Sequence, residues 1–245
     1  MAGPSREPRP RAPEVGDRWD AVVAEAARLF AVKGYDGTSL QDVADAVGLL
    51  KSSLYHYITT KEDLLYEVNA RMLERRAPAV AEDEHIRTAP APVRLRSFME
   101  RWMTLAGREG KQGLAAELEF KKLSPRRLRS IMRTRDRYGE FVKGILQQGI
   151  DEGYFEPALD LSVATNAVFS TMRGPLTWFR PSGALAYAEV IDWHVRLMVR
   201  GLGGDAAVAA AYGPSAPAAG SLSRRTGPAR KAGRRAGGAS PLHDS

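Results

Sequence analysis

Apolar side chains recur every three to four residues along the chain between about residue 17 and residue 202, which is the period of an amphipathic α-helix. No segment keeps up the strict alternation of apolar and polar positions that marks a half-buried β-strand. The pattern therefore predicts an all-α protein of about nine helices.

The first predicted helices are short and closely spaced. A helix near 17–33 has one apolar stripe and stops at Gly34, a residue suited to a left-handed C-terminal cap. A second helix begins at Thr38, where Thr38-Ser39-Leu40-Gln41 has the form of a capping box, and ends at Gly48. A fourth is capped at Thr60 and runs towards Pro78.

The third predicted helix carries the sequence KSSLYHYI, in which Leu54 and Ile58 are the buried positions. A helix made only for solubility would carry Glu and Lys here, and one made for burial would carry Leu and Ala. Two short helices around a glycine turn, the second exposing small polar and aromatic side chains, are typical of a helix-turn-helix motif. In that motif the second helix lies in the DNA major groove. We therefore expect residues 17–61 to bind DNA.

The helices after Pro90 are longer, and their predicted ranges are 92–108, 111–122, 125–152, 160–180 and 184–202. The last two carry apolar residues on more than one face, so they need packing partners on both sides. Gly174-Pro175 predicts a kink, because proline lacks the donor that a helix interior requires. The kink either makes room for a ligand or serves packing alone.

Composition separates the two ends from the body. Residues 1–16 and 204–245 are rich in Pro, Arg, Ala and Gly with few large apolar side chains, so we expect a disordered basic arm and a disordered basic tail. The net charge is +7, and the tail supplies part of the excess through six basic residues against two aspartates. A positive surplus favours polyanionic partners.

Several classes of protein have no support in the sequence. There is no Cys, and the four histidines are widely scattered without metal-ligand spacing: His56, His85, His194 and His243. We therefore expect no catalytic residue, no metal, no cofactor and no enzyme. No apolar run approaches the roughly 20 residues that span a bilayer, and the first residues lack the apolar core of a signal peptide. We expect a cytoplasmic protein without a membrane partner.

The segment TSLQDVADAVGLLKSSLYHYITTKEDLL resembles the N-terminal DNA-binding domain of the TetR/AcrR family of bacterial regulators, across about 45 residues with the preceding Phe30, Gly34 and Tyr35. The resemblance implies that Lys51, Ser52, Ser53 and His56 read the major groove. It implies backbone contacts by Thr38, Tyr55, Tyr57 and Lys61. Structural burial of Tyr55 and simple solvation of His56 remain open alternatives.

Two positions depart from the family pattern. Leu50 stands where a serine usually caps the recognition helix, so that cap is missing, at a cost of about 1 kcal/mol. Ile58 replaces a customary phenylalanine and is a smaller core side chain. Neither change removes a DNA contact, although both bear on how the helix enters the groove.

In proteins of this family the remaining helices form a ligand pocket and a dimer interface. The resemblance therefore implies that residues 62–203 bind a ligand and dimerise. The helices near 160–180 and 184–202 would pair with their copies in a second subunit and present two reading heads to a palindromic operator.

The stretch from LSPRRLRSIMRTRDRYG to TWFRPSG is similar to a branch of the family that controls fatty-acid or sterol-ring breakdown and responds to acyl-CoA thioesters. That similarity implies an apolar slot and a cationic mouth, the latter drawn from Arg126, Arg127, Arg129, Arg133, Arg135 and Arg137. The pocket candidates are Met99, Trp102, Met103, Phe120, Arg133, Arg137, Phe141, Phe169, Met172, Arg173 and Trp178.

The sequence thus predicts a transcriptional repressor that a small molecule, such as an acyl-CoA thioester, releases from double-stranded operator DNA. Two alternatives are a DNA-binding regulator without a small-molecule switch, and an activator.

Overall fold

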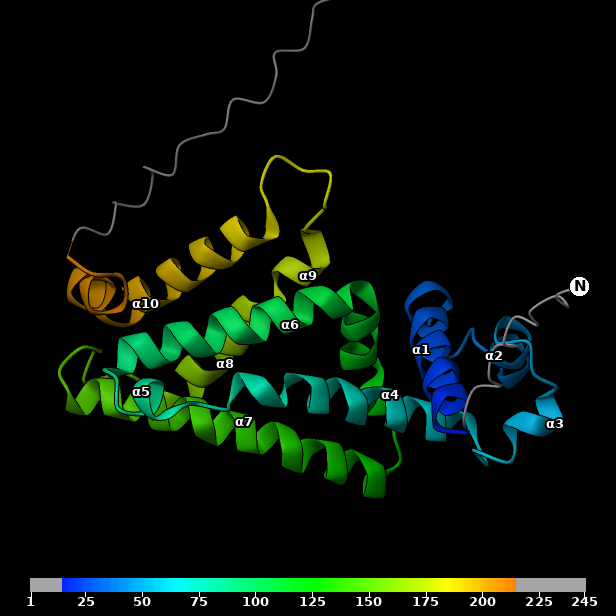
Figure 1. The fold of residues 1–245 in the computed structure, drawn as a ribbon. Helices are drawn as coiled ribbons and strands as arrows, with labels where there is room; N and C mark the ends of the chain where they lie inside the picture. Colours follow the sequence, from blue (N-terminus) through cyan, green and yellow to red (C-terminus); the bar gives the residue numbers. More distant parts are fainter. Residues whose placement is uncertain (1–14, 215–245) are drawn as a thin grey trace, which may run out of the picture.

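A computed structural model describes residues 15–214 of the chain. Over that range the protein is all-helical, which confirms the predicted fold class, with two 3₁₀ turns at Ala77–Ala79 and Phe120–Lys122. The helices are α1 (Val15–Lys33), α2 (Leu40–Ala46), α3 (Lys51–Leu54), α4 (Lys61–Arg76), α5 (Glu84–Arg87), α6 (Ala91–Glu119), α7 (Pro125–Asp151), α8 (Leu161–Arg173), α9 (Pro175–Trp178) and α10 (Tyr187–Tyr212). Figure 1 shows α1 to α3 at one end of the molecule and α10 towards the other.

The N-terminal end, which we call the head, is the unit formed by α1, α2 and α3 around a small apolar core. The buried side chains come from all three helices: Val22, Ala26, Phe30, Val43, Ala44 and Leu54. Leu64 and Leu65 of α4 complete this core, so the head packs directly on the helix that follows it.

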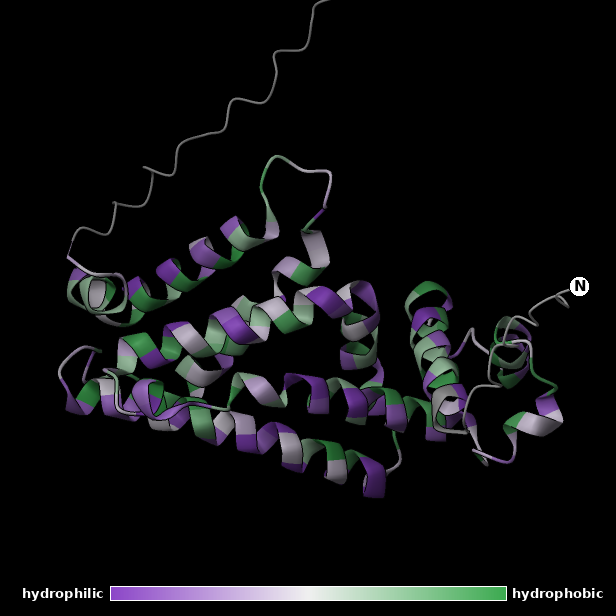
Figure 2. Cartoon of the chain, viewed as in Figure 1, coloured by the Kyte–Doolittle hydropathy of each residue, from purple (hydrophilic) through white to green (hydrophobic). Residues whose placement is uncertain are grey.

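Helix α4 connects the head to the rest of the chain. Thr60 is its N-cap, as the sequence predicts, and Asp63 accepts hydrogen bonds from the backbone amides of Thr59 and Thr60 at 2.7 and 2.6 Å. The helix packs on α1, α6 and α7. Figure 2 shows hydrophilic residues interspersed with hydrophobic ones along α4 and α7, as helices with one buried face require.

Helix α6 is one bent helix where the sequence predicts two. Gly110 has φ 56° and ψ −136° inside it, a conformation that only glycine adopts readily. The predicted ranges 92–108 and 111–122 correspond to the two halves of α6. Figure 1 shows the second half turning at the end of α6 nearest α1.

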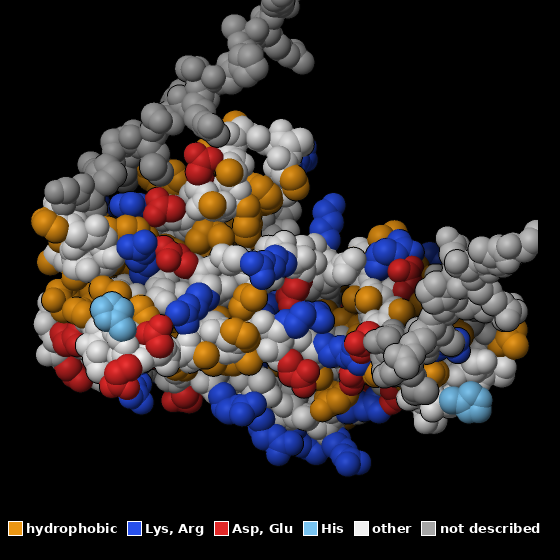
Figure 3. All heavy atoms as spheres, in the orientation of Figure 1, with side chains coloured by type: hydrophobic (Ala, Val, Ile, Leu, Met, Phe, Trp, Pro, Cys, Tyr) orange, Lys and Arg blue, Asp and Glu red, His pale blue; other side chains and the backbone are white. Residues whose placement is uncertain are grey.

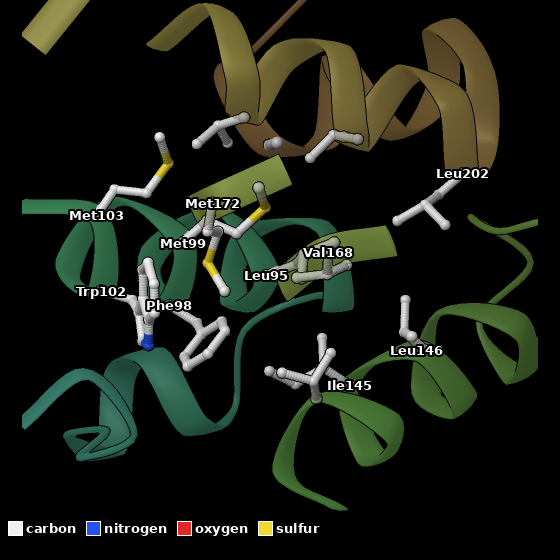
Figure 4. Close-up of a cluster of buried hydrophobic side chains, with 14 of the residues drawn as sticks. Leu95, Phe98, Met99, Trp102, Met103, Ile145, Leu146, Val168, Met172 and Leu202 are labelled. Carbon is white, nitrogen blue, oxygen red and sulfur yellow. The ribbon is translucent and has the colours of Figure 1, made fainter. Parts of the chain in front are cut away.

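The larger core is formed by α6, α7, α8 and α10. Figure 4 shows its fully buried side chains, among them Leu95 and Met99 of α6, Ile145 of α7 and Val168 of α8. The predicted interruption at Gly174-Pro175 is confirmed, because α8 ends at Arg173 and the short α9 follows.

Helix α10 corrects the predicted C-terminal boundary. It continues past a break at Gly203 and Gly204 to Tyr212, and Ala207, Val208 and Ala211 are buried against the larger core. The prediction of a disordered tail from residue 204 is therefore wrong for residues 204–212. The rest of the predicted tail, 215–245, and residues 1–14 of the predicted arm lie outside the described residues.

The helices within residues 15–214 include none with the length and apolar content needed to cross a membrane.

Candidate nucleic-acid interface and internal cavity

Helix α3 is a single turn with apolar side chains beneath it and polar side chains on its outer face. Leu54 and Ile58 are buried in the head, as predicted, while Lys51 and Ser52 are exposed. Tyr55, directly after α3, is 51% exposed, so it is not a core residue. The outer face of this segment, formed by Lys51, Ser52, Tyr55 and His56, is open to a partner, with Ser53 and Tyr57 half-buried beside it.

The start of α2 is fixed by a reciprocal cap. The Ser39 hydroxyl accepts from the Asp42 amide at 3.1 Å, and the Asp42 carboxylate accepts from the Ser39 amide at 2.8 Å. A hydrogen bond from Lys33 at 2.5 Å, with support from Ser39, holds the pKa of Asp42 far below its usual value. This carboxylate stays ionised, and the cap persists, throughout the neutral range.

The turn from α2 to α3 depends on Gly48. Its φ is +66°, in the left-handed region, and the Leu49 amide donates to the Ala44 carbonyl at 2.9 Å to close the turn. Leu50 is the N-cap of α3 and makes no side-chain capping bond, so the absence of a cap expected from the sequence is confirmed.

Thr38 has a different role from the predicted one. The N-cap of α2 is Ser39, so the prediction that Thr38 caps this helix is wrong. Thr38 is 1% exposed, and its hydroxyl donates to the Gly34 carbonyl at 2.8 Å. Since the hydroxyl is engaged inside the head, it shapes the turn after α1. A phosphate contact by Thr38 stays a prediction.

Lys61 joins α4 to the same turn. Its ammonium group donates to the carbonyls of Tyr35 and Thr38 at 2.8 and 2.9 Å and lies 4.4 Å from the centroid of the Tyr35 ring. These contacts hold the front of α4 against the head. A phosphate contact by Lys61 stays a prediction.

Tyr57 is paired with an aromatic residue that the sequence reasoning missed. The Tyr57 ring stacks on Trp19 of α1 with centroids 5.7 Å apart and planes 5° from parallel. Arg71 of α4 lies over the Trp19 ring at 5.9 Å. The sequence signal was a large aromatic residue at the start of the first helix, three residues before Val22 and on the same apolar face.

An internal cavity of about 350 Å³ lies between α4, α6, α7 and α8. Met132, Asp136, Ser162 and Asn166 are exposed lining residues from α7 and α8, so the cavity opens between these helices. Its inner wall combines the apolar and aromatic residues Leu73, Trp102, Tyr138 and Phe169 with the polar residues Arg76, Glu117, Arg135, Thr165 and Arg173.

Arg76 joins α4 to both halves of α6. This arginine is 2% exposed, and its guanidinium group pairs with Glu109 at 2.7 Å and Glu117 at 3.1 Å, on opposite sides of Gly110. It also lies 4.5 Å from the centroid of the Trp102 ring. The bend in α6 is therefore held by a side chain that lines the cavity.

Glu117 attracts two further arginines. Arg173 of α8 donates to its carboxylate at 3.2 Å, and Arg135 of α7 has its nearest Glu117 oxygen at 3.8 Å. Arg135 lies over the Phe120 ring, 4.1 Å from the centroid. Burial lowers the pKa of the Arg135 guanidinium, against the opposing attraction of Glu117.

The predicted pocket residues divide into two groups. Trp102, Phe169 and Arg173 line the cavity. Figure 4 shows Met99, Met103 and Met172 within the larger core, where each is 0% exposed. These three methionines face neighbouring helices across a packed core and do not line the cavity, so their part in a ligand pocket stays a prediction.

The other five candidates also lie outside the cavity. Phe141 packs on Phe98 with ring centroids 5.5 Å apart, and Phe120 supports Arg135. Arg133 and Arg137 are exposed on α7, and Figure 3 shows Lys and Arg side chains along the outer edge of that helix. Trp178 is 52% exposed and stacks on His194.

A second hollow, of about 660 Å³, is an apolar groove between α8 and α10. Val163 and Leu197 line it and are 67% and 58% exposed. Ala167, Gly174 and Gly201 also line it, and their small side chains allow another helix to approach closely. Figure 3 shows hydrophobic side chains gathered nearby, over α9 and the start of α10.

Within residues 15–214, no group of three or more His, Asp or Glu side chains is arranged to hold a metal ion.

Two family models match the chain. The model described as "Bacterial regulatory proteins, tetR family" matches residues 22–68, which cover most of the head and the first half of α4. The model described as "Tetracyclin repressor-like, C-terminal domain" matches residues 88–202, which include three of the four helices around the cavity and all the residues that line the groove.

Three solved structures are similar over most of the chain. The TetR family transcriptional regulator PfmR from Thermus thermophilus is 34% identical, covers 73% of this chain and 97% of its own, and has a TM-score of 0.65. The ketosteroid transcriptional regulator KstR2 of Mycobacterium tuberculosis is 27% identical, covers 78% of this chain and 97% of its own, and has a TM-score of 0.67. AibR in complex with isovaleryl coenzyme A and operator DNA is 28% identical, covers 76% of this chain and 98% of its own, and has a TM-score of 0.66.

Proposed function

The chain belongs to the TetR family of bacterial regulatory proteins, and we propose that it is a DNA-binding transcriptional repressor released from a palindromic operator by a small molecule. One observation carries the proposal. A head with an open polar face and a cavity for an effector lie in the same chain, and α4 extends from one to the other.

The DNA-binding domain in this proposal is residues 17–61. Lys51, Ser52, Ser53 and His56 read base edges in the major groove, and Tyr55 and Tyr57 contact the backbone. Support comes from the exposure of the outer face of α3 above its buried anchors, Leu54 and Ile58. Short serine side chains allow the helix backbone to come close to the base pairs.

Two copies of the chain form the active repressor. We assign the dimer contact to α8 and α10, whose exposed Val163 and Leu197 flank an apolar groove lined with small residues. A two-fold axis through this contact presents two heads to two half-sites, which is why the operator is a palindrome.

The proposed effector is an acyl-CoA thioester. Support comes from the solved complex of AibR, which contains isovaleryl coenzyme A and operator DNA. A cavity of about 350 Å³ suits an acyl group, with the larger coenzyme A part at the mouth between α7 and α8. An effector that favours a different angle of α4 shifts the dimer towards a state with the wrong head spacing.

This assignment makes the chain a regulator and not an enzyme, and it places its action in the cytoplasm, where bacterial DNA lies. Residues 62–212 form the effector-binding and dimerisation part, which extends the predicted boundary by the buried end of α10.

The experiment that tests this function has two stages. Sheared DNA from the source genome is passed over the immobilised full-length protein, and the retained fragments are sequenced. We expect a shared palindrome. Isovaleryl-CoA and longer acyl-CoA thioesters are then titrated into the complex of protein and palindrome while fluorescence anisotropy reports release.

The outcomes separate the alternatives. Retention without any shared sequence contradicts a sequence-specific regulator. Binding to a palindrome that no thioester reverses favours a regulator without this class of effector. Transcription in vitro that rises on binding, instead of falling, identifies an activator.

A further inference from the structure

The charges at the floor of the cavity do not cancel. Arg76, Arg135, Arg173 and Glu117 line the cavity, and Glu109 pairs with Arg76 behind it. Among the described residues no other carboxylate forms an ion pair with these three arginines. Asp136 and Glu140 line the cavity from exposed positions on α7, where water screens them. Glu109 also pairs with the exposed Arg75 at 3.3 Å, so this ion-pair network contains more arginines than glutamates.

Arg135 carries the excess. Arg76 has two carboxylates within hydrogen-bond distance and Arg173 has one, whereas the closest carboxylate oxygen to Arg135 is 3.8 Å away. The Nε and Nη2 atoms of Arg135 are buried and have no hydrogen-bond partner within residues 15–214. A buried guanidinium group without a hydrogen-bond acceptor is energetically unfavourable, so its presence indicates that a bound ligand supplies the acceptor.

A second unpartnered donor lies in the same wall. Thr165 of α8 is 6% exposed, lines the cavity, and its hydroxyl also lacks a partner in the described part of the chain. Arg135 and Thr165 come from the two helices that flank the mouth. Both residues line the cavity, so an anion that enters between α7 and α8 would lie beside the two side chains.

We propose that the cavity binds a carboxylate of the effector, which accepts hydrogen bonds from Arg135 and Thr165 while its apolar body packs on Trp102 and Phe169. The proposal rests on the proposed function and narrows its effector class to organic acids. A carboxylate matches the planar guanidinium group and supplies negative charge, of which the cluster has too little to balance its arginines. A thioester carbonyl is neutral and supplies none. The effector is therefore a free acid, or a thioester whose acyl chain ends in a second carboxyl group.

A carboxylate bound at this site also affects the contacts between α4 and α6. A carboxylate on Arg135 lies next to Glu117, and Glu117 is the side chain that holds Arg76 across the bend in α6. Repulsion between the two carboxylates weakens the Glu117 interaction with Arg76. Through Glu117, the bound effector thereby weakens the ion pair that connects α4 to the second half of α6.

A first experiment needs no effector. The thermal midpoint of the full-length protein is compared with those of R135M and R173M. Because two buried donor atoms of Arg135 have no hydrogen-bond acceptor, whereas Arg173 donates to Glu117 at 3.2 Å, R135M should raise the midpoint by a few degrees while R173M lowers it. A midpoint that falls in R135M as it does in R173M would make Arg135 an ordinary structural ion pair and overturn the proposal.

A second experiment uses four probes of equal chain length: octanoate, octanol, octanoyl-CoA and the mono-CoA thioester of octanedioic acid. Affinities are measured by calorimetry for the wild type and R135M. Octanoate and the octanedioic thioester should bind the wild type about tenfold or more tightly than R135M, and neutral octanol should not distinguish the two proteins. The free acid and the diacid thioester, compared with each other, identify the source of the carboxylate.

Failure of the carboxylate site and failure of the proposed function give different experimental results. Equal affinities of wild type and R135M for all four probes would overturn the carboxylate site. If octanoyl-CoA then still releases the protein from its palindrome, the proposed function stands without it. A protein that retains no specific DNA fails the proposed function, whatever the probes show in the cavity.

Discussion

Polar side chains of the head divide according to where their hydrogen bonds go. Thr38 and Lys61 bond to backbone carbonyls of the turn after α1, so they fix the position of α2 and α4. Within residues 15–214, the side chains of Lys51 and His56 make no hydrogen bond or ion pair, although a charged or polar helix face commonly does. Atoms that the fold leaves unused on an ordered surface are the ones available to DNA.

Substitution of Lys51 by alanine should weaken binding to the retained palindrome and make it less sensitive to salt. If the Lys51 ammonium group contacts a phosphate in addition to a base edge, its loss releases fewer condensed counterions and reduces the slope of log affinity against log salt by about 0.9 per subunit. Arg87→Ala is the control, because it removes an exposed positive charge from α5, distant from the head. An unchanged slope in Lys51→Ala would exclude a phosphate contact by this residue.

Thr38→Val should lower the free energy of unfolding by about 1 kcal/mol, because the Gly34 carbonyl loses its hydroxyl donor in a buried site. Thr38→Ser keeps the hydroxyl and should recover most of this loss. Chemical denaturation of the two variants measures both values. If Thr38→Val is as stable as the wild type but binds DNA poorly, the hydroxyl serves DNA and not the turn.

The same residues show what sequence reasoning can and cannot resolve. Exposure of Lys51 and burial of Leu54 follow from helical periodicity alone, and both were predicted. The choice between Thr38 and Ser39 as cap does not, since both residue types are good caps and are adjacent. The structure decides it, because the Asp42 carboxylate completes a capping box with Ser39, whereas the Gln41 side chain donates to Asp45 and is not available to Thr38.

Pocket residues were harder to predict for a related reason. Periodicity places Arg133 and Arg137, four residues apart, on one side of the helix and Arg135 on the other, but it does not say which side will face α8. Only the packing of α7 against α8 turns Arg135 inward and leaves the other two exposed. Methionines at core positions and at pocket positions have the same sequence pattern, so the sequence could not assign Met99 and Met172 to the core or to a pocket.

At the scale of helices, glycines determine where long segments bend. Gly110 divides α6, and Arg76 pairs with a glutamate on each side of it, so the bend is both permitted by the backbone and fixed by ion pairs. The break at Gly203 and Gly204 allows the last turns of α10 to pack on the larger core. That segment was predicted as tail because alanine dominates it, yet alanine also has the highest helix propensity.

Gly110→Ala should lower the free energy of unfolding by about 1 to 3 kcal/mol, since a residue with a Cβ is strained at φ 56° and ψ −136°. Gly144→Ala is the matched control. Gly144 lies inside α7 with open space around an added Cβ, so its replacement should stabilise the protein by up to about 1 kcal/mol. Urea denaturation measures both. Stabilisation by Gly110→Ala, in place of the expected loss, would mean that the bend is not needed by the folded state.

At the scale of the whole molecule, function depends on the distance between two ends of an elongated chain. The head lies at one end, and the apolar groove between α8 and α10 lies away from it (Figure 1). A dimer built on that groove holds the two heads through α4 and α6, so a small change at the cavity is carried to both heads. A single head binds its half-site weakly, and strong operator binding requires the dimer contact, which gives the second head a high effective concentration at the neighbouring half-site.

Leu197→Glu should convert the dimer to a monomer. Leu197 is 58% exposed in the single chain, so a charge there costs the monomer little, but a charge buried in an apolar interface is strongly unfavourable. Leu118→Glu is the control, because Leu118 is 68% exposed on α6 and does not line the groove. Sedimentation velocity should show monomers only for Leu197→Glu, and operator affinity should fall steeply for that variant alone, since each head then binds its half-site without the effective concentration that the partner provides. A Leu197→Glu protein that sediments as a dimer would remove the interface from α8 and α10 and, with it, the explanation for a palindromic operator.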